Sequence, residues 1–135
     1  MYVSARLDYA LRALAALATE DGPVTAALLA ERQGASVSYI AAILHELRRE
    51  GILVNVRGRR AGYRLARPAT EISVADVVSA LRVWPVDIHG ANGAPDEIGE
   101  RLALLWERVG SATVEVLASV SVAGLALGAE RVGVP

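Results

Sequence analysis

The 135-residue sequence contains no cysteine, no phenylalanine and no lysine, and only 4% of its residues are aromatic. The absence of cysteine excludes disulfides, thiolate zinc sites and cysteine-ligated iron–sulfur clusters. Because aromatic residues are so few, the core must consist mainly of alanine, leucine and valine, which favours helices. A hydrophobic fraction of 53% is typical of a folded globular protein.

Long hydrophobic runs are absent as well. The longest uncharged run near the C-terminus, Val116 to Ala129, has 14 residues, which is too few to span a bilayer. Arginine and aspartate interrupt the first turns of the chain, so no signal peptide is expected. The sequence therefore predicts a soluble cytoplasmic protein of one domain, with or without an added oligomerisation element.

All fourteen basic residues are arginines, and their distribution is uneven. Residues 48–67 hold seven arginines and one acid, a net charge of +6, whereas the rest of the chain has a net charge of −7. Such a cluster is typical of a surface that binds a polyanion, although an isolated charged loop more often serves only solubility. The elements that carry the cluster decide between these two interpretations.

Helical spacing of apolar residues predicts three helices in the N-terminal half of the chain. Each is preceded by a residue whose hydroxyl oxygen is suited to cap a first turn: Ser4, Thr25 and Ser36. Each is followed by a glycine: Gly22, Gly34 and Gly51. In the second helix, Leu28 and Leu29 are expected on one apolar face. Three helices separated by short turns are compatible with a helix-turn-helix unit.

The following segment is expected to form a β-hairpin. Residues 52–56 are rich in β-branched side chains, residues 57–62 have the composition of a turn, and residues 63–66 alternate before Pro68. In a winged helix-turn-helix domain the third helix enters the major groove of DNA, and the hairpin, or wing, reaches the neighbouring backbone or minor groove. Because the arginine cluster coincides with this hairpin, the sequence favours DNA binding over a solvated turn.

The remainder of the chain is expected to be helical around one loop. Ser73 is suited to cap a helix that runs to about Val83, and a longer helix begins near Glu97, with a break possible at Gly110. A last short helix follows Ser121. The expected fold is mainly α with a small β-hairpin, divided into a winged helix-turn-helix domain (1–83), a variable loop (84–97) and a C-terminal helical dimerisation segment (98–135).

Four blocks of this sequence, residues 9–18, 29–53, 56–68 and 71–81, resemble successive blocks of the Rrf2-type bacterial transcription regulators. The similarity is strong from residue 4 to about 82 and extends further only in layout. It implies a homodimer that is held by the long helix after the winged domain and binds an inverted-repeat operator on double-stranded DNA. Our interpretation of the whole sequence is a transcriptional regulator that acts as a repressor. It leaves open an effector that is a small molecule or a protein.

The same resemblance assigns the DNA-facing residues, which are Arg6 beside a phosphate, Ser36, Ser38 and Tyr39 on the third helix, and Arg57, Arg59 and Arg60 on the wing. Two of these have a second interpretation. Ser36 fits a helix cap better than a base contact, and Tyr39 fits equally well as a ring packed on the domain with only its hydroxyl outside. The predicted dimer interface is an apolar stripe too large to leave exposed on a soluble monomer: Ile98, Leu102, Leu105, Trp106 and Val109.

Three departures from the family pattern alter these expectations. Many relatives bind an iron–sulfur cluster through three cysteines in the loop that corresponds to residues 84–97, and this chain has none. No cofactor is therefore expected. The wing, often Gly-Pro-Gly-Gly-Gly-Tyr, has Arg59, Arg60 and Ala61 at its middle. Ala41 occupies a position where relatives carry a polar residue that contacts bases, so the family's usual operator preference is not expected to hold.

Other chemistry is sparse in the sequence. Asp87 and His89 are two residues apart, but two ligands do not make a metal site, so no metal is expected. His45 lies on the third helix, either exposed or near the DNA backbone. No catalytic motif is present, so an enzyme is not expected. Trp84 and Trp106 flank the variable loop. They are interpreted either as residues that line a small-molecule pocket or as core or dimer contacts. The rival hypothesis is a protein–protein interaction module that binds a partner enzyme, with weak or no specific DNA binding.

Overall fold

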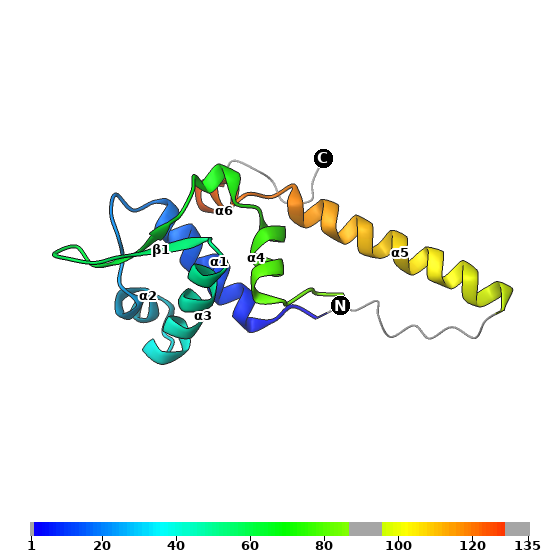
Figure 1. The fold of residues 1–135 in the computed structure, drawn as a ribbon, viewed down its shortest axis with the longest axis horizontal. Helices are drawn as coiled ribbons and strands as arrows, with labels where there is room; N and C mark the ends of the chain where they lie inside the picture. The colour runs from blue at the N-terminus through cyan, green and yellow to red at the C-terminus, as the bar shows by residue number, and fades with distance from the viewer. Residues whose placement is uncertain (1, 87–95, 129–135) are drawn as a thin grey trace.

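The computed structural model describes residues 2–86 and 96–128, which form an elongated molecule with a β-hairpin at one end and a long helix at the other (Figure 1). In chain order the elements are α1 (Ala5–Ala18), α2 (Ala26–Gln33), α3 (Val37–Arg49), β1 (Leu53–Val56), β2 (Gly62–Leu65), the 3₁₀-helix η1 (Ala69–Glu71), α4 (Val74–Leu81), α5 (Glu97–Ala118) and α6 (Val122–Leu127). The expected fold class, mainly α with a small hairpin, is confirmed.

The first three helices begin at the predicted caps. The hydroxyl oxygen of Ser4 accepts from the N–H of the residue two positions on at 3.2 Å, that of Thr25 from Leu28 at 3.2 Å, and that of Ser36 from Tyr39 at 3.3 Å. The expectation for α2 is wrong in one respect, because Leu29 is buried whereas Leu28 is 39% exposed. Adjacent residues on a helix point about 100° apart, and the face of α2 that meets the core is centred on Leu29 and Ala30, so Leu28 lies at its outer side.

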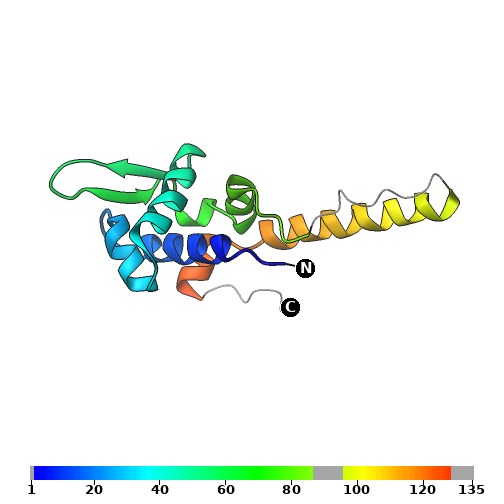
Figure 2. The same cartoon turned by 90° about the horizontal axis from the view of Figure 1, so that it is seen from below.

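The core lies where α1, α3 and α4 meet, and α6 completes it. Its largest fully buried side chains include Leu14, Ile43, Leu47 and Val77. We call α1–α4, η1, the hairpin and α6 the winged domain. The expected division of the chain at residues 83 and 98 stays a prediction, but the segment 98–135 contains two different parts: α5 projects outward, and α6 returns to pack against α1 (Figure 2).

The hairpin is anchored to the loop before α2. Strands β1 and β2 pair antiparallel, and Val24 extends the pairing because its N–H and C=O bond to Tyr63 at 2.9 and 2.8 Å. Gly62 makes this approach possible. Its φ is +149°, and a Cβ at this position would lie 2.6 Å from the carbonyl carbon of Val24. Only glycine fits there. The close approach allows the hydrogen bonds between Val24 and Tyr63, and these hold the base of the wing against the helical part of the domain.

Helix α5 is continuous through Gly110, so the break considered at that position does not occur. The side chain of Asp96 caps it by accepting from the N–H of Gly99 at 2.7 Å, and an ion pair joins Glu97 to Arg101 at 2.9 Å. Its C-terminal turn lies against α4, and the rest projects from the winged domain. Among the residues that the structure describes, no helix is long and apolar enough to cross a membrane.

Candidate nucleic-acid interface

Helix α3 buries one face and exposes the other. Its core side chains are Ile40, Ile43, Leu44 and Leu47. The opposite face carries four exposed residues at helical spacing, which we call the α3 stripe: Ser38, Ala42, His45 and Arg49. The stripe is an acid-free row of a hydroxyl, a methyl, an imidazole and a guanidinium group, and the side chains in it that can hydrogen-bond are those of Ser38, His45 and Arg49. Such groups are suited to contact base edges and phosphates in a DNA major groove.

The first turn of α3 shows which serine caps the helix and which is exposed, a question that the sequence left open. The Ser36 hydroxyl is occupied as a helix cap, whereas the neighbouring Ser38 is exposed and serves no cap. Tyr39 is half-buried, and its ring meets that of Tyr9 edge to face, with centroids 5.4 Å apart. The packing of Tyr39 on the domain is therefore observed, and the contact of all three residues with DNA stays a prediction.

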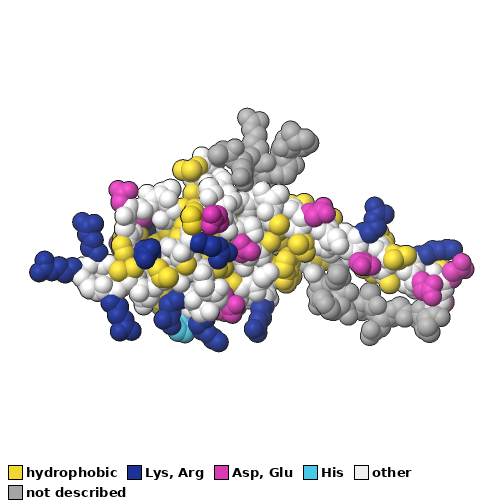
Figure 3. Space-filling model, turned by 45° about the horizontal axis from the view of Figure 1, so that its top comes forward, with side chains coloured by type: hydrophobic (Ala, Val, Ile, Leu, Met, Phe, Trp, Pro, Cys, Tyr) yellow, Lys and Arg dark blue, Asp and Glu magenta, His cyan; other side chains and the backbone are white. Residues whose placement is uncertain are grey.

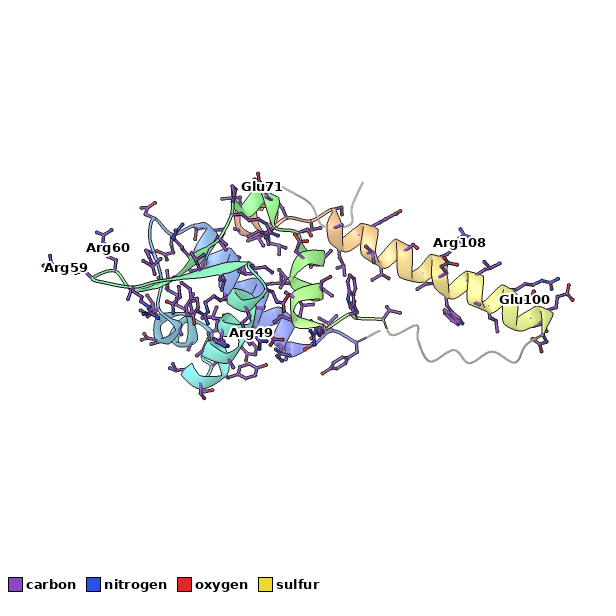
Figure 4. All side chains as sticks on the ribbon, viewed as in Figure 1. Arg49, Arg59, Arg60, Glu71, Glu100 and Arg108 are labelled. Carbon is purple, nitrogen blue, oxygen red and sulfur yellow. The ribbon has the colours of Figure 1, made fainter. Side chains whose placement is uncertain are left out.

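The wing presents its arginines to solvent. Arg57, Arg59 and Arg60 are exposed, and none of them has an acidic partner among the described residues. Arg59 and Arg60 lie at the tip of the hairpin, beyond all helices, and Arg49 lies on α3 (Figure 4). Arginine side chains also line one edge of the winged domain (Figure 3). Unpaired guanidinium groups on a protruding hairpin are suited to contact phosphates.

Two arginines are held by the fold rather than presented freely. Arg67 donates to a side-chain oxygen of Asp76 at 3.2 Å and to the backbone oxygen of Glu71 at 3.2 Å, so it links the end of β2 to α4. Arg6 on α1 forms an ion pair with Glu46 on α3. Sequence reasoning missed both acidic partners, and no local signal identifies a pair whose members are 40 residues apart. The proximity of Arg6 to a phosphate stays a prediction.

His45 contacts a neighbouring arginine on α3. Nη2 of Arg48 lies 3.3 Å from Nδ1 of the imidazole. Because a guanidinium group only donates, Nδ1 is the atom that would accept in this contact. The sequence placed His45 as exposed or near the DNA backbone, and the structure places it in the middle of the α3 stripe.

The predicted dimer stripe lies on the projecting helix, and its large apolar side chains are exposed. Ile98 is 64% exposed, Leu102 42% and Leu105 47%. Trp106 is exposed, and Val109 is half-buried. The apolar surface is wider than the predicted stripe, since three further residues of α5 are exposed: Leu104, Val114 and Val116. Figure 4 places Glu100 and Arg108 on the same helix, at the opposite end of the molecule from the wing.

The possible metal ligands Asp87 and His89 lie outside the described residues. Within residues 2–86 and 96–128, no group of three or more histidine, aspartate or glutamate side chains is placed to hold a metal ion. Trp84, before the variable loop, is 40% exposed, and Trp106, after it, is 39% exposed.

A helix-turn-helix unit, a basic wing formed by a β-hairpin, and a helix α3 that contacts β1 and exposes its opposite face define a winged helix-turn-helix DNA-binding protein. The profile of the Rrf2 family, described as iron-dependent transcriptional regulators, matches residues 3–127. The chain therefore belongs to the Rrf2 family, a family of regulators and not of enzymes, and the resemblance seen in the sequence is confirmed.

Curated relatives and solved structures agree with this assignment. The chain is 35% identical to the transcriptional regulator IscR of Aliivibrio salmonicida over 125 residues, which cover 91% of this chain and 71% of that protein. The structure of T. potens IscR matches with a TM-score of 0.76 and 30% identity, covering 100% of this chain and 93% of that one. CymR, the global cysteine regulator of B. subtilis, matches with a TM-score of 0.78 and 26% identity, covering 96% and 99%.

The family description names iron, and a cysteine-ligated iron–sulfur cluster would need thiolate donors that this chain does not have. Iron–sulfur clusters are held chiefly by cysteine thiolates, and the sequence has no cysteine. Its two histidines are in separate parts of the chain, one on α3 and one outside the described residues. The residues present therefore do not fit a cysteine-ligated cluster.

Proposed function

We propose that the protein is a homodimeric transcriptional repressor that binds an inverted-repeat operator and works without an iron–sulfur cluster. The observation that carries this proposal is the separation of two unsatisfied surfaces at opposite ends of the molecule. The α3 stripe and the unpaired wing arginines occupy one end, and the exposed apolar surface of α5 occupies the other. A dimer formed through α5 leaves both DNA-binding surfaces accessible.

On the DNA side, the proposal assigns base contacts to the first turn of α3 and backbone or minor-groove contacts to the wing. Ser38 is exposed on α3 and has a hydroxyl group that can both donate and accept. Arg57, Arg59 and Arg60 provide charge without an intramolecular partner. Ser36 and Tyr39 support the same surface through the cap and the packed ring, and Arg6 belongs to it through its ion pair with Glu46.

On the dimer side, the proposal pairs α5 with α5 of a second copy. Ile98, Leu102, Leu105 and Val109 recur at alternating spacings of four and three residues, the pattern by which two helices pack along a common seam. Trp106 lies beside this seam. A symmetric dimer presents the same surface twice, which is why an inverted repeat is the expected operator.

The test is selection of bound duplexes from a random pool, followed by mobility-shift assays at moderate salt. The proposal expects a palindromic consensus, bound with a stoichiometry of two chains per duplex. A protein that interacts only with a partner enzyme would enrich no consensus. Transcription in vitro from a promoter that carries the consensus then separates repression from activation.

The absence of a cluster has its own test. Protein purified under anaerobic conditions and incubated with ferrous iron and sulfide should show no visible absorption from an iron–sulfur centre after desalting. It should also bind its consensus with the same affinity before and after this treatment. A stoichiometric cluster, with matching iron and sulfide content, would overturn this part of the proposal.

A further inference from the structure

Two side-chain contacts join α1 and α3 where their packed faces reach the protein surface. Tyr9 of α1 meets Tyr39 of α3 edge to face, and Arg6 of α1 forms an ion pair with Glu46 of α3. Tyr39 and Glu46 are seven residues apart, so they lie on the same side of α3, two turns from each other. Both are half-buried, between the core face and the α3 stripe.

Glu46 is the only acidic residue within α3, which spans Val37–Arg49. It directly follows His45 in sequence and lies three and four residues from Arg49 and Ala42, so members of the α3 stripe are its neighbours on the helix. Its side chain is 34% exposed. An acid at this place is unfavourable for a helix that must approach phosphates, because like charges repel most strongly where solvent is excluded.

Arg6 is the cation that cancels this charge. Its Nη2 donates to Oε2 of Glu46, and its side chain is 37% exposed. The two residues are far apart in the sequence, and the packing of α1 on α3 brings them together. Because the ion pair lies at the border of the α3 stripe, DNA that approaches the stripe meets a neutral pair in place of a carboxylate.

We propose that Arg6 acts on DNA binding through Glu46: it neutralises the carboxylate on the recognition helix and holds it away from the phosphates. This inference rests on the proposed DNA-binding function. Arg6 is thus a positioning residue of the interface, and its guanidinium need not be bonded to a phosphate itself. The direct phosphate contact that the family resemblance implies is the competing role, since a guanidinium group has five N–H donors and the ion pair does not use them all.

A double-mutant cycle separates the two roles, using the wild type, Arg6→Ala, Glu46→Gln and the double variant. Affinities are measured for the selected consensus and for a random duplex of equal length. If Arg6 acts through Glu46, Arg6→Ala weakens binding about fivefold or more, and the double variant binds within about twofold of Glu46→Gln, because the two residues are strongly coupled. If Arg6→Ala costs the same factor in both backgrounds, the proposal is overturned.

The salt dependence of binding gives a second readout. A direct phosphate contact by Arg6 would lower the magnitude of the log–log salt slope by about 0.9 per subunit, or about 2 per dimer, whether or not Glu46 is present. The proposal expects no such loss when Glu46→Gln is compared with the double variant. Arg6→Lys keeps the cation and should retain most of the affinity.

The controls distinguish this role from a purely structural ion pair. Arg12→Ala removes another arginine of α1 that is paired with an acid at 2.7 Å, but its partner, Asp8, belongs to α1 itself and not to α3. It should leave DNA affinity within about twofold of the wild type, as expected of an exposed pair. A lower melting temperature for Arg6→Ala with unchanged affinity of the folded protein would show that the pair serves only stability, and would overturn the proposal.

Failure of the proposed DNA-binding function can be distinguished from failure of the role proposed for Arg6. If the wild type binds no DNA at all, the proposed function fails, whatever the role of Arg6. If Arg6→Ala does not fold, the affinity of the Glu46→Gln variant alone tests the role of Arg6. The proposal expects it to bind the random duplex at least as tightly as the wild type, because an acid is removed and Arg6 is released. Weaker binding by a folded Glu46→Gln would overturn the proposal.

Discussion

The winged domain and α5 are both rich in apolar residues, but they direct them to different partners. In the winged domain the apolar side chains of α1, α3, α4 and α6 pack against one another and form one buried cluster. In α5 no residue is buried, although the helix carries Ile98, Leu102, Leu105 and Trp106. The same residue types therefore stabilise the fold in one region and remain available for another molecule in the other.

This difference has a consequence for stability. The winged domain has its own core, whereas only the C-terminal turn of α5 packs against that domain. A helix that otherwise projects into solvent is marginal in water, and Gly110 lowers its helix propensity further. We infer that α5 gains most of its stability from a second copy of the chain. Substitutions in the two regions should accordingly differ in what they disrupt.

The largest effect is expected from Leu105→Asp, which places a carboxylate in the middle of the proposed seam. Burying this charge without a partner would cost several kcal/mol, on the order of 3 to 5. Analytical ultracentrifugation should show monomers, and operator binding should collapse because the two half-sites are no longer bound together. Glu107→Gln, on the same helix outside the predicted stripe, is the matched control and should remain dimeric.

Hydrogen exchange sharpens this comparison. In the Leu105→Asp variant, amides of α5 should exchange rapidly, while those of α3 keep the protection given by the core. A dimer of unaltered affinity would place the interface elsewhere on the molecule.

The next largest effect is expected within the winged domain, from Gly62→Ala. The new Cβ would lie 2.6 Å from the backbone of Val24, at a residue with φ of +149°. Strain and overpacking together would cost about 2 to 4 kcal/mol. Thermal unfolding should show a lower melting temperature for the winged domain, with dimerisation retained. Gly58→Ala is the control, because φ there is +111° but nothing lies within 4 Å of a Cβ; a similar loss in both variants would show that the clash with Val24 is unimportant.

A smaller effect is expected from Ser36→Ala, which removes the cap of α3. Loss of the hydrogen bond to the N–H of Tyr39, 3.3 Å long, would cost about 1 kcal/mol. Ser38→Ala is the matched control, since Ser38 is exposed on the same turn and caps nothing. We expect Ser36→Ala to lower the melting temperature, and Ser38→Ala to preserve it while relaxing the base preference in the selected consensus. A lower melting temperature for Ser38→Ala and a relaxed base preference for Ser36→Ala would contradict this assignment of the two serines.

The elements that sequence reasoning predicted well are those fixed by neighbours in the chain. The caps of the first three helices and the hairpin depend on residues within one turn of each other, and all were found. Contacts between distant segments were missed. Glu46 as the partner of Arg6 and Asp76 as the partner of Arg67 become visible only when α1 and α4 are packed in space.

Two other features of the structure differ from the sequence-based expectations, also because the sequence pattern is local. The spacing of apolar residues indicated a short helix after Ser121, but not that Val122 would be buried beside η1 and α1, because periodicity gives the orientation of a face and not its partner. Gly110 lowers local propensity without breaking α5, since the hydrogen bonds on both sides continue the helix. For the site, the sequence predicted which side chains are exposed on the wing, and their contacts with DNA remain predictions.

The smallest effect on stability, with a large effect on binding, is expected when both wing-tip arginines are replaced. Arg59 and Arg60 are exposed and have no acidic partner among the described residues, so Arg59→Ala/Arg60→Ala should leave the melting temperature nearly unchanged. If each subunit neutralises about three phosphates, the dimer makes about six contacts and the salt slope is near −5. Loss of about four contacts would reduce its magnitude by about 3 to 4.

The type of DNA that loses affinity identifies what the wing reads. If Arg59 and Arg60 contact only phosphates, the consensus and a random duplex should weaken by similar factors, because phosphates carry no sequence information. A stronger loss on the consensus would show that the wing reads the width of the minor groove, where negative potential depends on sequence. Salt titrations of both duplexes, with Arg32→Ala as a control whose arginine is paired with Glu20 at 2.7 Å, measure this difference. Unchanged affinity and slope in a folded double variant would reduce the wing to a solvated turn and leave recognition to α3.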